Sequence, residues 1–402
     1  MSEGAGARSG IVAARGAAPG VAGDGLEERR ARPDLLRVEV NWDGERVTDA
    51  ALVRAPVPEA RQLVGLTVDE ALQRVGRLDG ASPQMQEIAA TAALAAAGAV
   101  GVTRQEAWAE ERAIAAETAQ THLSRLMLDW PALFGHVPRR ERFDVLYRRL
   151  FQVGNTRSAF DLGGEILDLV AVELLGGFFR ATREPTALRE FVDRARRGGT
   201  IGAALADLIE MGSSTSEPES VPLMPVLTAE AWRHELAGVP SAEFCAAPTL
   251  YGKTFETGVL ARHADSMLVR ILLGNGHRIA ARLFARVIDL SDCASRLRHP
   301  LADDMPKLVD VSGDGAGFGL AWVETARGQL MHVLRLDGER IADYAVVGPT
   351  QWNFNRDGAF AFEGKRWSAP TLRAALLRCN ALVLALDPGS EFEIAVKEPS
   401  AQ

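Results

Sequence analysis

The chain has 402 residues, of which 47% are hydrophobic and 24% charged, the balance of an ordinary soluble globular protein with a sizeable core. Its formal net charge is −8, and its arginine-rich stretches are interleaved with acids, which argues against a nucleic-acid partner. The three cysteines stand far apart and form no CxxC pair, which argues against a disulfide framework and against a local zinc or iron–sulfur site.

The chain carries no apolar run long enough for a transmembrane helix. The nearest segment, residues 89–102, is alanine-rich and too short to span a bilayer. No signal-peptide pattern is recognisable at the start, and the number of cysteines is odd. We therefore expect a cytoplasmic protein in a reducing compartment, without a membrane partner.

The ordered part of the chain is predicted to begin with a hairpin. Residues 1–33 are rich in Gly, Ala and Arg, a composition that predicts a disordered tail. Alternating side chains at 36–42 lead through the turn signal Asp43-Gly44 into residues 45–50. A small antiparallel hairpin is expected there.

Helical signals dominate the next two hundred residues. Thr67 to Glu70 forms a capping box, and Pro83 begins a helix that runs to about Ala97. We expect further helices near 103–128, 140–153, 158–180, 185–196, 200–211 and 228–237, one or two across 256–290 with a break at 274–276, and a last one at 370–384. Residues 212–225 are typical of a loop.

Strand signals return late in the chain. Residues 318–325, 329–336 and 340–347 alternate, and Asp337-Gly338 forms a tight turn between the last two. The predicted fold class is α+β, mostly α: a helical core with small antiparallel β-hairpins near both ends.

Two segments, one between the first two of these strands and one after the third, have unusual composition. In residues 324–328, Arg327 at a tight glycine turn can aim its planar donors at an anionic ligand, although the segment alone is more typical of a hairpin loop with an exposed ion pair. In residues 346–355, Pro349 fixes the backbone and Trp352 needs a partner for its N–H. Structural locking of a loop and a functional role are equally good interpretations of this second segment.

The two ends of the chain carry motifs that resemble the metal-binding motifs of nickel–iron hydrogenase large subunits. The first motif of that family, R-x-C-G-x-C-P-x-x-H, corresponds to residues 77–86, with Asp79 and Ser82 at the cysteine positions. The second, D-P-C-x-x-C-x-x-H, corresponds to residues 387–395. There Gly389 and Phe392 take the cysteine positions.

Three further motifs follow in the family's order. Residues 324–328 look like its E-x-P-R-G loop, residues 349–353 like its P-T-x-W-N loop, and residues 258–262 like its G-P-L-A-R helix start. The match extends from Leu36 to Ala395 and is weakest between 130 and 240. The chain is most similar to the degenerate accessory paralogues of the HupK/HoxV type, which are encoded with hydrogenase maturation genes.

This resemblance implies a single hydrogenase-large-subunit-like domain over residues 34–395, followed by a short tail at 396–402. It also implies that the metal ligands are lost. A nickel–iron centre is held by four thiolates, whereas Gly389 and Phe392 cannot ligate and Asp79 and Ser82 offer only hard oxygens. We expect no catalytic residues, no resident metal and no enzymatic activity.

The expected function is therefore that of an accessory protein in hydrogenase maturation, a scaffold or chaperone whose partners are the hydrogenase large subunit or other maturation proteins. The family's iron-site loops remain in outline. Glu324, Arg327, Pro349 and Thr350 mark where a transient Fe(CN)2CO fragment would be contacted through hydrogen bonds.

Two other classes of function compete with this expectation. The first is a structural, metal-free component of a respiratory oxidoreductase complex, because the quinone-side large subunit of complex I shares the fold and the loss of metal ligands. The second is an unrelated enzyme that uses the old cavity. It would need the carboxylates of Asp79 and Glu324 close together.

Overall fold

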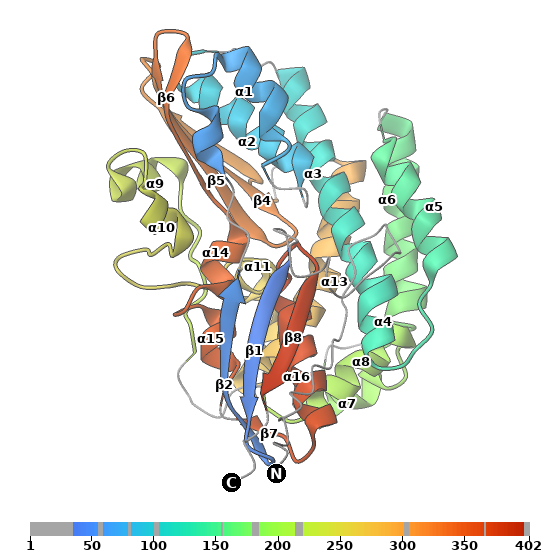
Figure 1. Cartoon of the computed structure of the whole chain (residues 1–402). Helices are drawn as coiled ribbons and strands as arrows, with labels where there is room; N and C mark the ends of the chain where they lie inside the picture. The colour runs from blue at the N-terminus through green and yellow to red at the C-terminus, as the bar shows by residue number, and fades with distance from the viewer. Residues whose placement is uncertain are drawn as a thin grey trace, which may run out of the picture.

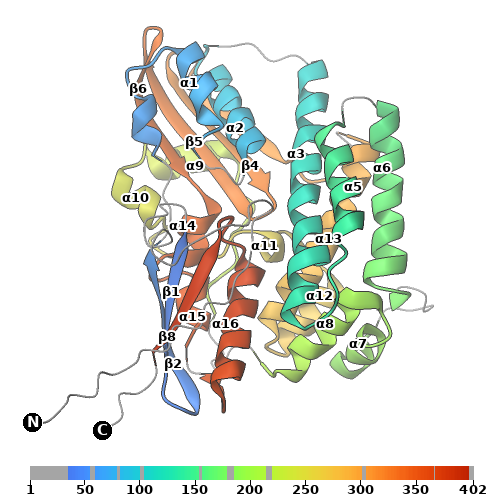
Figure 2. The same ribbon diagram turned by 45° about the vertical axis from the view of Figure 1, so that its right-hand side comes forward.

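The computed structural model describes residues 35–54, 59–78, 82–99, 104–153, 156–178, 185–213, 220–300, 305–365 and 367–397. The predicted tail over residues 1–33 and the ligand position Asp79 lie outside these ranges. Figure 1 shows a largely helical body with two sheets, and Figure 2 shows the long helices α3, α6 and α13 running side by side.

The helices account for most of the described residues. In chain order they are α1 Val68–Val75, α2 Pro83–Ala96, α3 Arg104–Ser124, α4 Trp130–Leu133, α5 Arg140–Phe151, α6 Thr156–Asp168, α7 Leu188–Ala195, α8 Gly199–Glu210, α9 Ala229–Leu236, α10 Ala242–Ala246, α11 Val259–His263, α12 Met267–Gly274, α13 Arg278–Arg298, α14 Pro349–Phe354, α15 Ala359–Glu363 and α16 Leu372–Leu386. The capping box is confirmed, because Thr67 accepts a hydrogen bond from the Glu70 amide and the Glu70 side chain accepts one from the Thr67 amide.

The first sheet joins the two ends of the chain. Its strands are β1 Leu36–Trp42, β2 Arg46–Arg54, β7 Trp367–Ser368 and β8 Phe392–Lys397, in the order β7-β2-β1-β8. The predicted opening hairpin is confirmed as the antiparallel pair β1–β2. Strand β8 was not predicted, and it pairs with β1 in parallel. The end of the chain therefore completes the sheet that the beginning started.

The second sheet is antiparallel throughout. It consists of β3 Val309–Gly313, β4 Phe318–Thr325, β5 Gly328–Asp337 and β6 Arg340–Val347, in chain order. Helix α2 packs against β4 so closely that a Cβ at Gly319 would lie 1.9 Å from the Ala93 carbonyl oxygen. Only glycine fits there. The predicted strands β4, β5 and β6 are confirmed, whereas β3 was missed.

The main core lies around α13, a 21-residue helix that packs against α3, α6, α11, α12 and α16. Its apolar side chains share one buried cluster with those of β1 and β8. This packing places the C-terminal segment against the helical body. The predicted fold class, α+β and mostly α, is confirmed.

Two local predictions were wrong. The segment 256–290 contains three helices, because the chain also breaks between α11 and α12 around residues 264–266. Residues 349–354 form the short helix α14 and not a loop, since Pro349 at the first helical position suits a helix start.

Among the described residues, no helix combines the length and apolarity needed to cross a membrane.

Candidate functional site

Three of the four predicted ligand positions are described, and none of them presents a thiolate. Ser82 precedes α2 and is 4% exposed. Gly389 lies between α16 and β8. Phe392, the first residue of β8, is 5% exposed and belongs to the main core cluster, paired in register with Leu36.

The guanidinium of Arg327 occupies the space between two of these positions. Its Nη2 donates a hydrogen bond to Ser82 Oγ at 2.6 Å. A Cβ added to Gly389 would lie 1.6 Å from Arg327 Nη1. A cation of this chain therefore fills the place that a side chain at position 389 would take.

The turn between β4 and β5 fixes the direction of Arg327. The Thr325 hydroxyl donates to the Gly328 carbonyl at 2.8 Å and accepts from the Arg327 amide at 3.2 Å. Gly328 has φ of +134°, and a Cβ there would lie 2.6 Å from the Thr257 side chain. Arg327 is 5% exposed. The sequence placed this residue in an unusual turn correctly, but the interpretation as an exposed ion pair was wrong.

The second predicted segment also contacts the C-terminal segment. Thr350 Oγ1 donates to the Pro388 carbonyl at 3.0 Å, next to Gly389. Asn353 joins α14 to the segment just before α11. Its side-chain oxygen accepts a hydrogen bond from the Thr257 backbone amide, and its side-chain nitrogen donates one to the Thr257 carbonyl, both at 3.0 Å. Pro349 begins the helix that presents Thr350.

Asp387 is the most strained residue next to the ligand positions. It ends α16 with φ 53° and ψ 88° and is 2% exposed. Its carboxylate accepts from Arg125 Nη2 at 2.8 Å and from Arg286 Nη1 at 3.0 Å. Burial raises the pKa of Asp387, but these two arginines outweigh burial and hold the pKa below its usual range. Their attraction stabilises a left-handed backbone that a non-glycine residue rarely adopts.

Arg125 reaches Asp387 from an irregular stretch of helix. Residues Arg125–Asp129 between α3 and α4 form π-helical turns, an arrangement that is common at functional sites. Within the stretch, Arg125 Nη1 donates to Asp129 Oδ2 at 2.6 Å. The predicted helix over 103–128 did not anticipate this irregularity.

Asp289 of α13 is the centre of a second group of charges. It accepts from Arg262 Nε at 2.9 Å and Nη2 at 2.7 Å, and it lies 2.6 Å from His122 Nε2. Burial lowers the pKa of His122 to about 4 despite Asp289. Arg262 Nη1 also donates to Glu324 at 2.7 Å. The partner of Glu324 is therefore Arg262 in the predicted helix start, and not the nearby Arg327.

A third group of buried charges lies nearer the start of α13 than the second. Arg282 donates to Glu256 at 2.7 and 2.8 Å and to Glu363 Oε2 at 2.9 Å, and Arg278 pairs with the same two carboxylates. Burial raises the pKa of Glu256, but Arg282 and Arg278 outweigh it and lower the pKa to about 2. Sequence reasoning missed this group. The spacing of Arg278, Arg282 and Arg286, four residues apart on one face of α13, was the available signal.

The position of the first motif's histidine is held by Gln86. Its Oε1 lies 2.8 Å from His332 Nε2, and His332 Nδ1 lies 2.8 Å from the Tyr344 hydroxyl. Burial lowers the pKa of His332 to about 3, so the imidazole is neutral. The polar contact that remains there joins α2 to the second sheet.

The residues at the ligand positions do not fit a nickel–iron centre. Ser82 offers a hard oxygen that is already hydrogen-bonded, Gly389 offers no side chain, and Phe392 offers only a buried ring. No three His, Cys, Asp or Glu side chains are grouped to hold a metal ion in the described ranges. A cavity of about 10 Å³ remains beside Arg327, at most the space of one water molecule.

The fold matches solved nickel–iron–selenium hydrogenases. The structure of the enzyme from Desulfovibrio vulgaris Hildenborough superimposes with a TM-score of 0.58 at 15% identity, over 87% of this chain and 95% of that chain. The enzyme of Desulfomicrobium baculatum in its reduced, active form gives 0.56 at 14% identity, over 87% and 95%. These values establish a common fold, and no family model matches the sequence.

Sequence similarity to curated proteins identifies the family. The hydrogenase expression/formation protein HupK of Azotobacter vinelandii is 28% identical over 386 residues, which cover 90% of this chain and 98% of the relative. The hydrogenase expression/formation protein HoxV of Cupriavidus necator is 30% identical over 290 residues, covering 67% of this chain and 73% of the relative. The chain belongs to the HoxV/HupK family of hydrogenase expression/formation proteins.

Proposed function

We propose that this protein is a non-catalytic accessory factor in nickel–iron hydrogenase maturation, and that it works as a scaffold or chaperone through the shape and surface of a large-subunit-like fold. The observation that carries the proposal is the placement of Arg327. Its guanidinium lies against Gly389 and is hydrogen-bonded to Ser82, so the chain itself fills the region where the fold's relatives bind metal.

The charges around this region support a structural role. Four arginines face four carboxylates in the two groups next to the ligand positions: Arg125, Arg262, Arg286 and Arg327 with Asp129, Asp289, Asp387 and Glu324. The positive and negative charges are equal in number. These arginines are already balanced by carboxylates of the chain, which favours a role for the outer surface over a role as a carrier of an iron–cyanide fragment.

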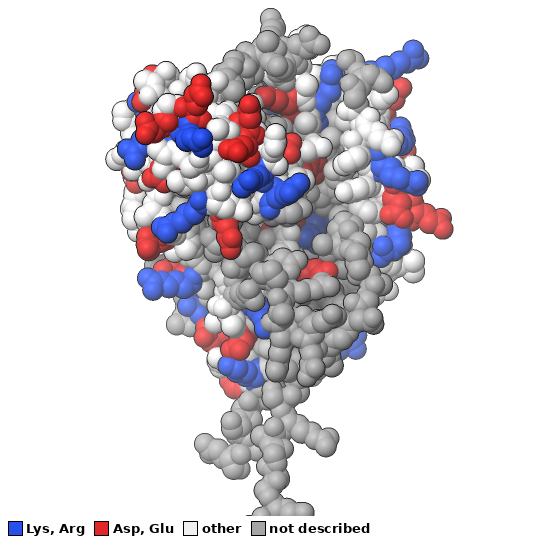
Figure 3. Space-filling view, turned by 45° about the horizontal axis from the view of Figure 1, so that its top comes forward, with Lys and Arg blue, Asp and Glu red and all other residues white. Residues whose placement is uncertain are grey.

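The partners we propose are the hydrogenase large subunit and other maturation proteins. On the upper part of the molecule in Figure 1, which is tilted toward the viewer in Figure 3, Lys and Arg are interleaved with Asp and Glu. A mixed surface of this kind favours recognition by complementary shape and local ion pairs over attraction to a field of one sign.

The test is an affinity purification of the tagged chain from cells that express the hydrogenase operon. We expect the large subunit or a maturation protein to be recovered with it, and to be absent from the same purification in cells that lack the hydrogenase genes. Recovery of neither partner would contradict the scaffold role.

The same preparation tests the alternative role as a carrier of an Fe(CN)2CO fragment. Iron content and infrared bands of bound cyanide and carbon monoxide are measured on the purified chain. We expect no stoichiometric bands. Bands at one fragment per chain that disappear in Arg327→Ala would establish the carrier role and overturn a purely surface-based one.

A further inference from the structure

The tight turn at residues 250–253 presents an exposed tyrosine on the outside of the molecule. Leu250 and Lys253 exchange two backbone hydrogen bonds, at 2.9 and 3.0 Å, so the chain reverses at Tyr251 and Gly252. The turn lies against the end of α9, because the Tyr251 amide donates a hydrogen bond to Glu235 Oε1 at 3.0 Å. Figure 1 shows α9 and α10, in yellow-green, at the left edge of the molecule.

Tyr251 adopts a backbone conformation that a bulky residue rarely takes. Its φ is 51° and that of Gly252 is 70°, as in a type I′ turn, whose two central positions favour Asn and Gly. Glycine at the second position follows this rule, whereas tyrosine at the first departs from it. Asn would fit the same backbone at a lower cost in free energy. The stability of the turn therefore gives no reason for a tyrosine at this position.

The Tyr251 side chain lies largely in solvent. The residue is 66% exposed, although an aromatic ring contributes most to binding or stability when it is buried. Its ring forms no aromatic or cation–π pair with any other described residue, and its hydroxyl forms no hydrogen bond with one. Backbone strain in natural proteins is concentrated at functional sites. A strained and exposed aromatic residue therefore indicates a contact with another molecule.

The surface around Tyr251 is poor in charge. Residues 236–252, here called the α9–α10 surface, contain one charged side chain, that of Glu243, whereas 24% of the whole chain is charged. Val239 and Phe244 within it are half-buried, because they pack on one side against the core cluster beneath. Few charges and an accessible tyrosine are the composition of the central part of a protein–protein interface.

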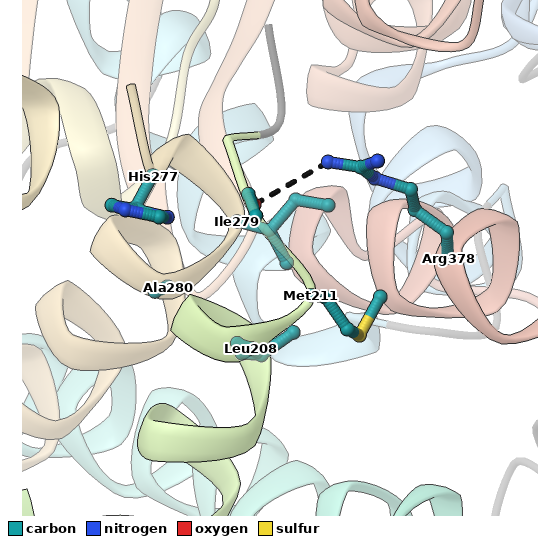
Figure 4. A pocket seen from close by; sticks show the side chains of 7 residues that line it. Leu208, Met211, His277, Ile279, Ala280 and Arg378 are labelled. Atoms are coloured by element: carbon teal, nitrogen blue, oxygen red, sulfur yellow. Dashed lines mark hydrogen bonds between the residues drawn. The ribbon is translucent and has the colours of Figure 1, made fainter. Parts of the chain in front are cut away.

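A second copy of the chain fits this surface poorly. The ring of Tyr251 needs a pocket in its partner, and two cavities among the described residues measure only about 10 Å³ each. One lies beside Arg327, and the other, drawn in Figure 4, has Leu208 and Arg378 in its lining. Each holds one water molecule at most, so neither can receive a phenol ring. A different protein with an apolar surface open to solvent is the better occupant.

A subunit that has not yet been assembled is a protein of this kind. The interface of a permanent complex is more apolar than other protein surfaces, and each subunit exposes it until the complex forms. The inference rests on the proposed function, which names the hydrogenase large subunit as a partner. We propose that the α9–α10 surface, with Tyr251 as its anchor, docks on the apolar surface that the large subunit buries when the hydrogenase assembles.

Binding to the purified large subunit tests this docking. The probe is the large subunit of the same operon, expressed without the other hydrogenase subunits, and its affinity for the full chain is measured by biolayer interferometry. Tyr251→Asn should weaken the binding by about tenfold or more. Phe151→Ala, which removes a 68% exposed ring from the end of α5, should leave it unchanged. Binding by Tyr251→Asn as tight as that of the unmodified chain would overturn the proposal.

Thermal unfolding shows whether a loss of binding comes from a damaged fold. Because Asn suits positive φ, Tyr251→Asn should unfold at the same midpoint as the unmodified chain or at a higher one. A lower midpoint would mean that the turn itself needs the tyrosine, and would contradict the proposal. Tyr251→Phe keeps the ring and should keep the binding. A loss as large as that of Tyr251→Asn would exclude docking of the ring on an apolar surface.

The assembled hydrogenase is the second probe. It should not bind the chain, because its subunit interface is closed, and binding as tight as that of the free large subunit would overturn the choice of surface. The affinity purification separates this inference from the proposed function. If the unmodified chain and Tyr251→Asn recover a partner equally well, only the role of the α9–α10 surface is wrong. If the unmodified chain recovers no partner, the proposed function fails as well.

Discussion

The degenerate ligand positions and the charged groups behind them are built in different ways. Arg327 donates a hydrogen bond to Ser82, and its guanidinium fits against Gly389. Arg282, by contrast, is enclosed by Glu256 and Glu363, and all three side chains are at most 2% exposed. In the ligand region, a side chain occupies the space mainly because its shape fits. The buried charges around that region are instead stabilised by ion pairs, in which each charged group needs its partner.

The largest expected effect on stability follows from removing Arg282, which pairs with Glu256 and Glu363. Arg282→Ala leaves two buried carboxylates with Arg278 as their remaining partner among the described residues, which should lower the free energy of unfolding by about 3–5 kcal/mol. Urea unfolding followed by circular dichroism measures this loss. Arg356→Ala, which removes an exposed ion pair with Asp357, is the control and should change little. Equal effects of the two substitutions would contradict the contrast drawn above.

The same group should make stability depend on acid. The pKa of Glu256 is about 2 in the folded protein, below its ordinary value, so its contribution is fully present above pH of about 4.5 and is lost as the pH falls toward 2. The free energy of unfolding measured across this range should fall less steeply in Glu256→Gln than in the unmodified chain. Parallel curves would show that Glu256 is not held ionised by its arginines.

A smaller effect is expected at the ligand positions, where shape dominates. Gly389→Ala places a Cβ against Arg327 at a residue with φ of +74°, which should cost about 2–4 kcal/mol. Arg327→Ala should relieve the clash, so the double variant should be more stable than additivity of the two single variants predicts. The four proteins of this cycle are compared by denaturant unfolding. Additive losses would mean that the guanidinium does not occupy this space.

The smallest effect is expected from the hydrogen bond between Arg327 and Ser82. Ser82→Ala removes this acceptor and should cost about 1–2 kcal/mol. The scaffold role predicts that this variant still recovers its partners in affinity purification, because the outer surface is unchanged. Loss of partner recovery with an intact fold would place the function at the ligand positions.

The features that the sequence predicted well depend on neighbours in the chain. The hairpin β1–β2, the capping box at Thr67 and the strands β4 to β6 all follow from turn residues and periodicity within a few positions. The helix α14 was read as a loop because Pro, Trp and Asn together are typical of loops. Its polar side chains turn inward to the C-terminal segment, and no local pattern shows that.

The candidate site was predicted in part. The motifs identified Arg327, Glu324 and the substituted ligand positions, but they did not indicate that Arg327 fills the space beside Gly389 or that Glu324 pairs with Arg262. Such contacts join residues far apart in sequence. Arginines on helices are usually solvated, so a helix that buries three of them on one face departs from the expectation that sequence reasoning applies.

The parallel pairing of β8 with β1 has a consequence for how the protein is made. Leu36 is opposite Phe392, so the first strand gains this neighbour only after the more than 350 residues between them and β8 itself have left the ribosome. Until then one edge of β1 is open, and Arg125 and Arg286 have no Asp387 to pair with. Closing a loop of this length is slow compared with local hairpin formation. The synthesis of β8 therefore sets the moment at which the first sheet and the Asp387 ion pairs can form.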